Sequence, residues 1–185
     1  MATKVLMSGI QPTGIMHIGN YLGFLRHFVK LQESEDYNRR ILKIADLHAI
    51  STGFVPSKKL REHICQTLAI LLSTGVDPFR TIIVQQSRVP ELTELMWILG
   101  TATTLAVPVG LATYPLLQAA DVLGYHSSHV LVGSDQTQHL ELLKEITSLV
   151  DSNEVVIEKI KSALSDFNPE ITFDPEKRPA ISNLV

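Results

Sequence analysis

Short apolar runs and helical stripes alternate along most of the chain. The run at residues 5–8 ends at Gly9 and Pro12, which is typical of a buried strand that leads into a loop. Three further strands are predicted at 41–45, 81–84 and 130–132. Between the strands, apolar residues recur at helical spacing and predict helices with one buried stripe each. These stripes are Ile18, Tyr21, Leu22, Leu25, Phe28 and Val29; Leu60, Ile64, Leu68, Leu71 and Leu72; and Leu140, Leu143, Ile146 and Val150.

Signals at helix ends complete the pattern. Pro56 and Ser57 open a helix that Gly75 closes, because proline suits a first helical turn and glycine suits the position after a last one. Two more helices are predicted at 91–99 and from Pro115 onward. This alternation predicts an α/β fold, a doubly wound parallel sheet covered on both faces, with ligands at the carboxyl ends of the strands. We expect residues 1–150 to form this domain, and 151–185 to form a helix and a tail.

Composition agrees with one folded domain. The chain has 185 residues, 45% of them apolar and 19% charged, so it can bury a substantial core and differs from disordered sequences. The net charge of -3 argues against a domain that grips nucleic acid through an overall basic surface. Any contact with RNA would therefore be local.

The expected compartment is the cytoplasm, with the mitochondrial matrix as the alternative. No apolar run reaches the length of a membrane span, and residues 1–4 lead straight into the first strand without a signal or transit peptide. We expect no membrane partner. Cys65 is the single cysteine and falls in an apolar helical pattern, so we predict a buried packing role for it.

The turn at residues 9–20 predicts a nucleotide site. It contains Gly9, Gly14 and Gly19 together with Pro12 and several polar side chains, at the point where a strand gives way to a helix. Glycines let a ligand approach the backbone, and the start of a helix favours negative charge. The spacing fits neither the Walker loop nor the dinucleotide fingerprint. A tight turn with a capping histidine is the alternative interpretation.

Four ordered blocks then resemble the class I aminoacyl-tRNA synthetases. The turn is similar to their His-Ile-Gly-His-type signature, in the Ser-Gly-Ile-Gln-Pro-Thr-Gly…Gly-Asn-Tyr form typical of the tryptophan-specific members. The other blocks are Asp-Leu-His-Ala-Ile at 46–50, Thr-Tyr-Pro-Leu-Leu-Gln-Ala-Ala-Asp at 113–121 and Val-Gly-Ser-Asp-Gln-Thr-Gln-His at 132–139. The tail at 171–184 is similar to the family as well.

The resemblance implies a Rossmann-like catalytic domain of a tryptophan–tRNA ligase. Such an enzyme activates tryptophan with ATP and Mg²⁺ and transfers it to tRNA(Trp), and it works as a homodimer. The implied catalytic residues are His17, Asn20 and Gln11, with His17 as a donor to the triphosphate. The implied ATP-binding residues are Gln11, Pro12, Thr13, Gly19, Asn20, Gly133, Ser134 and Asp135. Asp135 has a second interpretation as a helix cap.

The resemblance also implies a tryptophan pocket. Asp121 would accept the indole N–H, and a site built around that bond rejects analogues that lack the donor. The other implied pocket residues are Tyr114, Gln118, Gln136, Met7 and His48. For Tyr114 and Gln118, packing at a helix start is the alternative, and some family members carry methionine at the position of Gln118.

Three weaker signals are interpreted structurally. His126 and His129 lack a third ligand at suitable spacing, so no metal site is predicted. Trp97 lies in an apolar stripe with Leu92 and Met96, which favours core or dimer packing over ligand stacking. The basic residues Lys58, Lys59 and Arg61 are predicted to form a solvated helix face.

The chain departs from the family in two places. The Lys-Met-Ser-Lys-Ser loop is missing, because Glu145 and Ile146 lead directly to Ser148, and a basic segment is missing near Ala106. The helical domain that reads the anticodon would follow Val185. We therefore expect poor catalysis, whether the chain is shortened, lacks mobile loops or is a degenerate paralogue. Two alternatives stay open: a non-catalytic protein that binds tryptophan or ATP, and a nucleotidylyltransferase with a related histidine signature.

Overall fold

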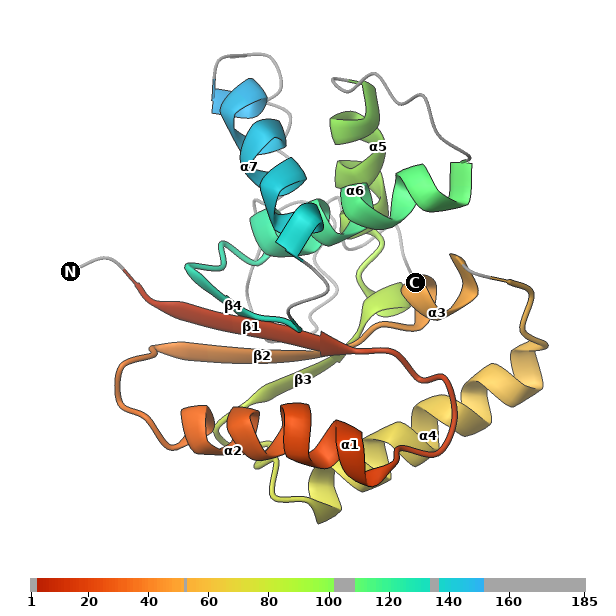
Figure 1. Ribbon diagram of the computed structural model, residues 1–185, viewed down its shortest axis with the longest axis vertical. Coiled ribbons are helices and arrows are strands. Elements are labelled where there is room, and N and C mark those ends of the chain that lie inside the picture. The colour runs from red at the N-terminus through yellow and green to blue at the C-terminus, as the bar shows by residue number, and fades with distance from the viewer. Residues whose placement is uncertain (1–2, 52, 102–108, 134–136, 152–185) are drawn as a thin grey trace, which may run out of the picture.

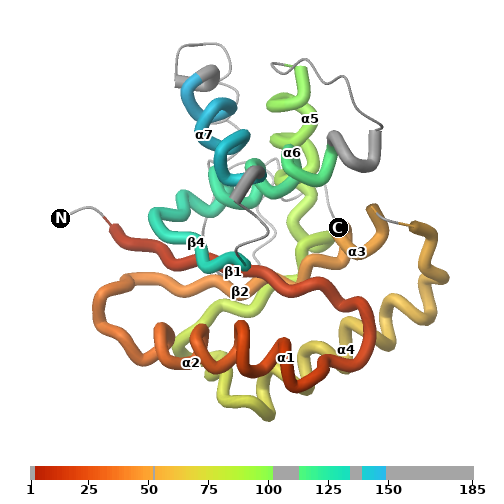
Figure 2. Tube along the Cα trace, viewed as in Figure 1, coloured from red at the N-terminus to blue at the C-terminus, as the bar shows by residue number. Residues whose placement is uncertain are grey.

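The computed structural model describes residues 3–51, 53–101, 109–133 and 137–151. Its centre is a sheet of four parallel strands in the order β3-β2-β1-β4. The strands are β1 Val5–Ile10, β2 Arg39–Ile44, β3 Ile82–Gln85 and β4 His129–Leu131. All four predicted strands are confirmed to within two residues at each end. The segments at 5–10 and 129–131 are far apart in sequence and lie side by side in Figure 2.

Helices cover both faces of this sheet, as predicted for a doubly wound fold (Figure 1). One face carries the helical segment that begins at α1 and the helix α4. The other face carries α3, α5, α6 and α7. The helices are α1 Ile18–Asn20, the π-helical segment η1 Tyr21–Leu25, α2 Arg26–Gln32, α3 Asp46–Ser51, α4 Ser57–Ser73, the 3-10 turn η2 Gln86–Arg88, α5 Glu91–Thr101, α6 Val109–Gly124 and α7 Thr137–Asp151.

The strand order puts a crevice beside β1. The chain moves from β1 to β2 and β3 in one direction and later returns to β4 on the other side of β1. In doubly wound sheets, ligands bind at the carboxyl ends of the strands where the order reverses in this way. The loops after β1 and β4 therefore flank the expected ligand site.

The first predicted helical stripe is only half buried. Leu25 and Phe28 are fully enclosed, whereas Ile18 is 70% and Leu22 is 49% exposed. The π-helical turn of η1 adds a residue to the helical repeat, so positions chosen at ordinary helical spacing drift off the inward face. The prediction that Ile18, Tyr21 and Leu22 pack inward is wrong.

Cys65 is exposed, so the prediction of a buried packing role is wrong. Helix α4 turns Thr67 and Leu71 inward, with exposures of 0% each, and leaves Leu68 and Leu72 partly in solvent. The outer side of α4 is thus more apolar than a simple stripe suggests. The predicted end of this helix at Gly75 is confirmed, since α4 closes there with a positive φ of 102° at Gly75.

Helix α6 begins at Val109, so the prediction that Pro115 opens it is wrong. Proline lacks a backbone N–H, and at this interior position it removes one helical hydrogen bond without ending the helix. Helix α6 packs on α5 and α7 through a core cluster that includes Leu95, Leu99, Leu116 and Ile146. The side chain of Val150, the predicted final helix and the tail at 152–185 lie outside the description.

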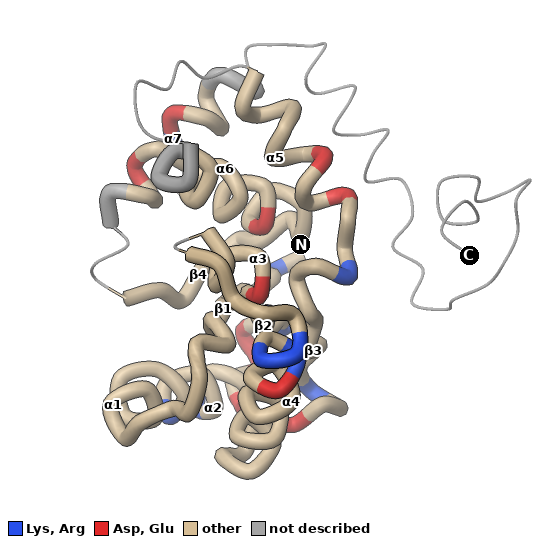
Figure 3. The backbone as a smooth tube through the Cα atoms, turned by 90° about the vertical axis from the view of Figure 1, so that its right-hand side faces the viewer, with Lys and Arg blue, Asp and Glu red and all other residues tan. Residues whose placement is uncertain are grey.

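Charge and hydropathy add two findings for the described part of the chain. No helix in the described ranges combines the length and apolar character that crossing a bilayer requires. In the view of Figure 3, acidic positions lie on α5 and α7, and the basic positions are scattered.

Candidate active site

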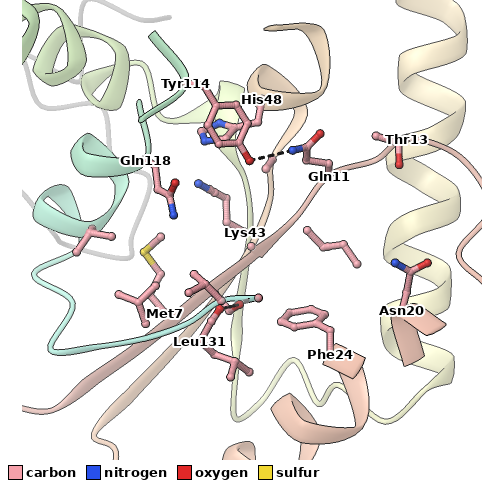
Figure 4. A pocket seen from close by; sticks show the side chains of 18 residues that line it. Met7, Gln11, Thr13, Asn20, Phe24, Lys43, His48, Tyr114, Gln118 and Leu131 are labelled. Atoms are coloured by element: carbon pink, nitrogen blue, oxygen red, sulfur yellow. Dashed lines mark hydrogen bonds between the residues drawn. The ribbon is translucent and has the colours of Figure 1, made fainter. Parts of the chain in front are cut away.

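A cavity of about 410 Å³ opens at the carboxyl ends of β1 and β4. This volume lies within the range of about 300–1,000 Å³ that small-molecule sites occupy. Its walls come from β1, β2, the loop after β1, α3, α6 and the loop after β4 (Figure 4). The predicted nucleotide turn and the predicted amino-acid pocket therefore open onto the same cavity.

The loop after β1 supplies the polar side of the cavity. Gln11, Thr13 and Asn20 line it, as Figure 4 shows, whereas Pro12 is buried within the loop. His17 and Gly19 do not belong to the lining and are exposed at the start of α1. The sequence did not distinguish the residues of this turn that line the cavity from those that do not.

His17 caps the helix that follows this loop. Its Nδ1 accepts a hydrogen bond from the Gly19 N–H at 3.1 Å, and the Asn20 side chain accepts from the His17 N–H at 3.0 Å. The predicted alternative of a capping histidine is therefore present. Because Nδ1 accepts, a neutral His17 carries its proton on Nε2, which can donate to a ligand. Gly19 is required here, since a Cβ at this position would lie 2.8 Å from His17 Nδ1.

The side of the cavity formed by β1, α3 and α6 is aromatic and amphipathic. Met7, His48, Tyr114 and Gln118 all belong to its lining. The rings of His48 and Tyr114 meet edge to face with centroids 4.3 Å apart, and Gln11 donates from Nε2 to the Tyr114 hydroxyl at 3.1 Å. Tyr114 and Gln118 lie inside α6 and face the cavity, which differs from the packing role at a helix start considered above.

Asp121 lies behind this wall. It is fully enclosed, with 0% exposure, and it is not part of the cavity lining. Its Oδ2 accepts from Lys43 Nζ in a buried ion pair, and both its oxygens accept from Gln86 Nε2, at 2.9 and 3.1 Å. Burial raises the pKa of Asp121, and the Lys43 ammonium opposes that shift. Burial likewise lowers the pKa of Lys43, against the attraction of Asp121.

Lys43 and Gln86 were missed by sequence reasoning. The signal for Lys43 was present, because a lysine within the apolar run at 41–45 of a buried parallel strand needs an acidic partner. Gln86 gave no comparable signal, since it lies in a short polar segment after β3.

Gln86 also contacts His48. Its Oε1 accepts from the His48 backbone N–H at 3.4 Å, and the ring Nδ1 of His48 lies 3.2 Å from Oε1 and 3.1 Å from Nε2 of the same amide. Burial, followed by the nearby Lys43 charge, lowers the pKa of His48 to about 3. His48 is therefore neutral at pH 7.

The remaining predicted residues differ in their placement. Gly133 lines the cavity, while Ser134, Asp135 and Gln136 lie outside the described residues. His126 and His129 belong to no cluster of three metal-ligating side chains within the described ranges. Trp97 is 74% exposed, which excludes a core role. Lys58, Lys59 and Arg61 are exposed, as predicted.

The chain matches the family described as tRNA synthetases class I (W and Y). The match covers residues 3–107 and 102–148 in two segments that overlap at 102–107. A mitochondrial tryptophan–tRNA ligase from Caenorhabditis elegans is 35% identical, over 98% of this chain and 69% of the relative. A tryptophan–tRNA ligase from Mycoplasmopsis pulmonis is 37% identical, over 100% of this chain and 75% of the relative.

Solved structures give the same result. The tryptophanyl-tRNA synthetase from Campylobacter jejuni superposes with a TM-score of 0.74 at 34% identity, over 81% of this chain and 50% of that chain. Its complex with ADP and tryptophan gives a TM-score of 0.72 at 33% identity. A tyrosyl-tRNA synthetase from Aeropyrum pernix shares the fold, with a TM-score of 0.69 at 20% identity. The matched region spans about half the length of these solved proteins.

The alignments also bear on the missing segments. The alignment with the Caenorhabditis elegans relative extends over 248 positions, more than the 185 residues of this chain, so the relative contains segments that have no counterpart here. The two segments of the family match meet at 102–107, where sequence analysis expects a missing basic segment.

Proposed function

This chain belongs to the class I aminoacyl-tRNA synthetases for tryptophan and tyrosine, and we propose that it acts as the catalytic domain of a tryptophan–tRNA ligase. In this proposal it binds tryptophan and ATP and forms tryptophanyl-adenylate. Transfer of the tryptophanyl group to tRNA(Trp) would follow. The relatives at 35–37% identity are named tryptophan–tRNA ligases, and a solved relative was crystallised with ADP and tryptophan.

One observation carries the proposal: a single cavity joins the loop after β1 to the wall of α6. Gln11 comes from the loop and Asn20 from α1, whereas Tyr114 and Gln118 come from α6. A ligase that makes an adenylate must hold two substrates in contact, because its reaction gains most of its rate from positioning. Gln11 reaches from the loop to the Tyr114 hydroxyl and so connects the two sides.

ATP would bind along the loop and the start of α1. Gln11, Thr13 and Asn20 face the cavity, and Pro12 and Gly19 shape the backbone around them. His17 would donate from Nε2 to the triphosphate as negative charge builds on the leaving pyrophosphate. Gly133, Ser134 and Asp135 would contact the ribose.

Tryptophan would bind between β1 and α6. Met7 and Tyr114 supply apolar surface for the indole ring, and the neutral His48 adds no charge next to it. Asp121 would accept the indole N–H from behind this wall. Gln118 and Gln136 would hold the ammonium and carboxylate groups.

The chemical step follows from this arrangement. A carboxylate oxygen of tryptophan would attack the α-phosphorus of ATP, the bond from that phosphorus to the bridging oxygen would break, and pyrophosphate would leave. Mg²⁺ would bind to the phosphates, where it neutralises charge. The described lining contains no carboxylate to hold the metal, so the ATP oxygens would be its main ligands.

Three finer features belong to the same proposal. A homodimer would cover the exposed Trp97 on α5. The cytoplasm is the proposed compartment, with the mitochondrial matrix as the alternative, since the Caenorhabditis elegans relative is named as mitochondrial. Catalysis by the chain of 185 residues would be slow, because losing even one donor to a developing negative charge commonly costs about 10²–10³ in rate.

A tryptophan-dependent exchange of pyrophosphate into ATP tests this function. We expect slow exchange that needs tryptophan and is not supported by phenylalanine or tyrosine. The matched control is Asn20→Ala, which removes a lining group of the ATP loop and should lower the exchange rate further. Exchange supported equally by tyrosine, or tryptophan binding with no exchange at any enzyme concentration, would contradict the proposal.

A further inference from the structure

Lys43 crosses the floor of the cavity. It is 3% exposed and extends from β2 toward α6, and it is the only lysine or arginine among the described lining residues (Figure 4). Lys43 pairs in register with Gly9 of β1. A Cβ on Gly9 would lie 3.0 Å from Lys43 Cε, so the glycine leaves room for the lysine stem.

The ammonium of Lys43 lies between the cavity and Asp121. Lys43 lines the cavity and Asp121 does not, although the two side chains form an ion pair with exposures of 4% and 0%. Removing one partner from such a buried pair leaves an uncompensated charge. The charge of the Asp121 carboxylate is therefore balanced by Lys43.

The hydrogen bonds that Asp121 accepts from Lys43 and Gln86 also limit which of its oxygens can accept from a ligand. An ionised carboxylate has about four acceptor positions, two on each oxygen. Lys43 and Gln86 occupy Oδ2, and Gln86 also donates to Oδ1. The remaining acceptor position is on Oδ1.

We propose that Lys43 is a positioning residue that determines specificity in the tryptophan site. Its charge opposes the rise in the pKa of Asp121 that burial causes, and its hydrogen bond to Oδ2 leaves Oδ1 to accept the indole N–H. The inference rests on the proposed function and adds to it a lysine that does not contact the reacting atoms. Gln86 holds the carboxylate from the other side.

The effect of removing Lys43 can be predicted from the groups around it. Burial raises the pKa of Asp121, and without Lys43 no cation would oppose that shift. The other titratable groups that face the pair are His48, Tyr125 and Asp46, with His139 facing His48. His48 is neutral, and burial followed by the Asp121 charge raises the pKa of Tyr125, so none of these residues can replace the lost ammonium at pH 7.

The test compares tryptophan with β-(3-benzothienyl)alanine, in which sulfur replaces the indole N–H. Titration calorimetry gives the ratio of the two dissociation constants from pH 6 to pH 9 for the chain and for Lys43→Met. In the unmodified chain the ratio should favour tryptophan and stay constant between pH 6 and 8. In Lys43→Met the preference should fall about tenfold at pH 6–7, because a neutral carboxyl accepts more weakly than a carboxylate, and it should recover as the pH rises. Lys144→Met, on the exposed side of α7, should leave the ratio unchanged.

Each outcome separates this inference from the proposed function. If the unmodified chain binds neither amino acid, the proposed function is wrong, and if it binds both equally, the roles of Asp121 and Lys43 are wrong. If it prefers tryptophan and Lys43→Met keeps that preference at every pH, the role of Lys43 is wrong. Should Lys43→Met fail to fold, the double variant Lys43→Met/Asp121→Asn restores neutrality and should match Asp121→Asn alone. In the unmodified chain, a preference that disappears between pH 8 and 6 would also overturn the inference.

Discussion

Gln11 Nε2 lies 3.1 Å from the hydroxyl of Tyr114, and this hydrogen bond joins the loop after β1 to helix α6. The two residues are 103 positions apart in sequence. They belong to the two halves of the proposed site, the ATP loop and the tryptophan wall. We therefore predict that a ligand bound on one side affects binding on the other.

Tyr114→Phe should weaken the coupling between the two substrates. The change removes the acceptor for Gln11 and keeps the ring against His48. One hydrogen bond contributes about 1 kcal/mol, so we expect tryptophan to improve ATP binding about fivefold less than in the unmodified chain. Calorimetric titration of ATP with and without saturating tryptophan measures this coupling. Tyr21→Phe, outside the cavity lining, serves as the control, and an unchanged coupling in Tyr114→Phe would contradict the prediction.

Asp121→Asn should reduce the preference for tryptophan over phenylalanine. A bond to a charged acceptor is worth about 1.5–3 kcal/mol, so the ratio of dissociation constants should fall by about tenfold to a hundredfold, with ATP affinity nearly unchanged. Asparagine suits this test better than alanine, because it keeps the side-chain volume and an oxygen that can accept from Lys43, although either change removes the charge partner of Lys43. A preference that survives in Asp121→Asn would exclude the assigned role of Asp121.

Much of the architecture could be predicted from the sequence. Each parallel strand contains a short apolar run, because both faces of the sheet are covered by helices, and these runs identify the strands. The loop after β1 was identified because its glycines and polar residues interrupt such a run. Gly75 was identified as a helix end because few other residues adopt its backbone conformation.

The errors have local physical causes. A π-helical turn changes the helical repeat, and the sequence at 21–25 does not signal it. Pro115 marks a helix start in most contexts but lies inside α6 here. The partnership of Lys43 and Asp121 joins residues 78 positions apart, and one sequence without relatives does not reveal which acid a buried lysine meets. The aromatic and polar residues that line the cavity were predicted from the family resemblance. The periodicity of apolar residues alone would not have identified them.

The stability of the fold should fall in mild acid because of His48. Burial lowers the pKa of His48 to about 3, whereas the unfolded chain takes up this proton near pH 6.5. The stabilisation is therefore complete above about pH 6.5 and is lost as the pH falls toward 3. The free energy of unfolding should decrease by up to about 1.4 kcal/mol per pH unit in this window through His48.

Urea unfolding at pH 7, 6 and 5 measures this slope. His48→Asn keeps a donor for Gln86 and removes the titrating ring, so its slope should be smaller than that of the unmodified chain. His27→Asn, at an exposed position of α2, should retain the original slope. Equal slopes for all three proteins would show that His48 is not buried in its neutral form.

Replacing Gly75 or Gly23 by alanine should change the free energy of unfolding in opposite directions. After α4, the Gly75 N–H donates to the Leu72 carbonyl at 3.3 Å and the Val76 N–H donates to the Leu71 carbonyl at 3.1 Å, with φ of +102° at Gly75. Alanine disfavours this conformation, so Gly75→Ala should lower the free energy of unfolding by about 1–2 kcal/mol. The space around Gly75 is adequate, since a Cβ there would lie 3.5 Å from Val29 Cγ1, so the cost comes from the backbone.

Gly23 is the matched control for this effect. It lies in the helical segment η1, and a Cβ there would meet no atom within 4 Å. Alanine costs less backbone entropy than glycine in a helix, so Gly23→Ala should raise the free energy of unfolding by about 0.5–1 kcal/mol. Urea unfolding of both variants at pH 7 measures the two changes. We expect the denaturant slope to be the same in both variants. Destabilisation by Gly23→Ala equal to that by Gly75→Ala would mean that glycine at 75 is not selected by its positive φ.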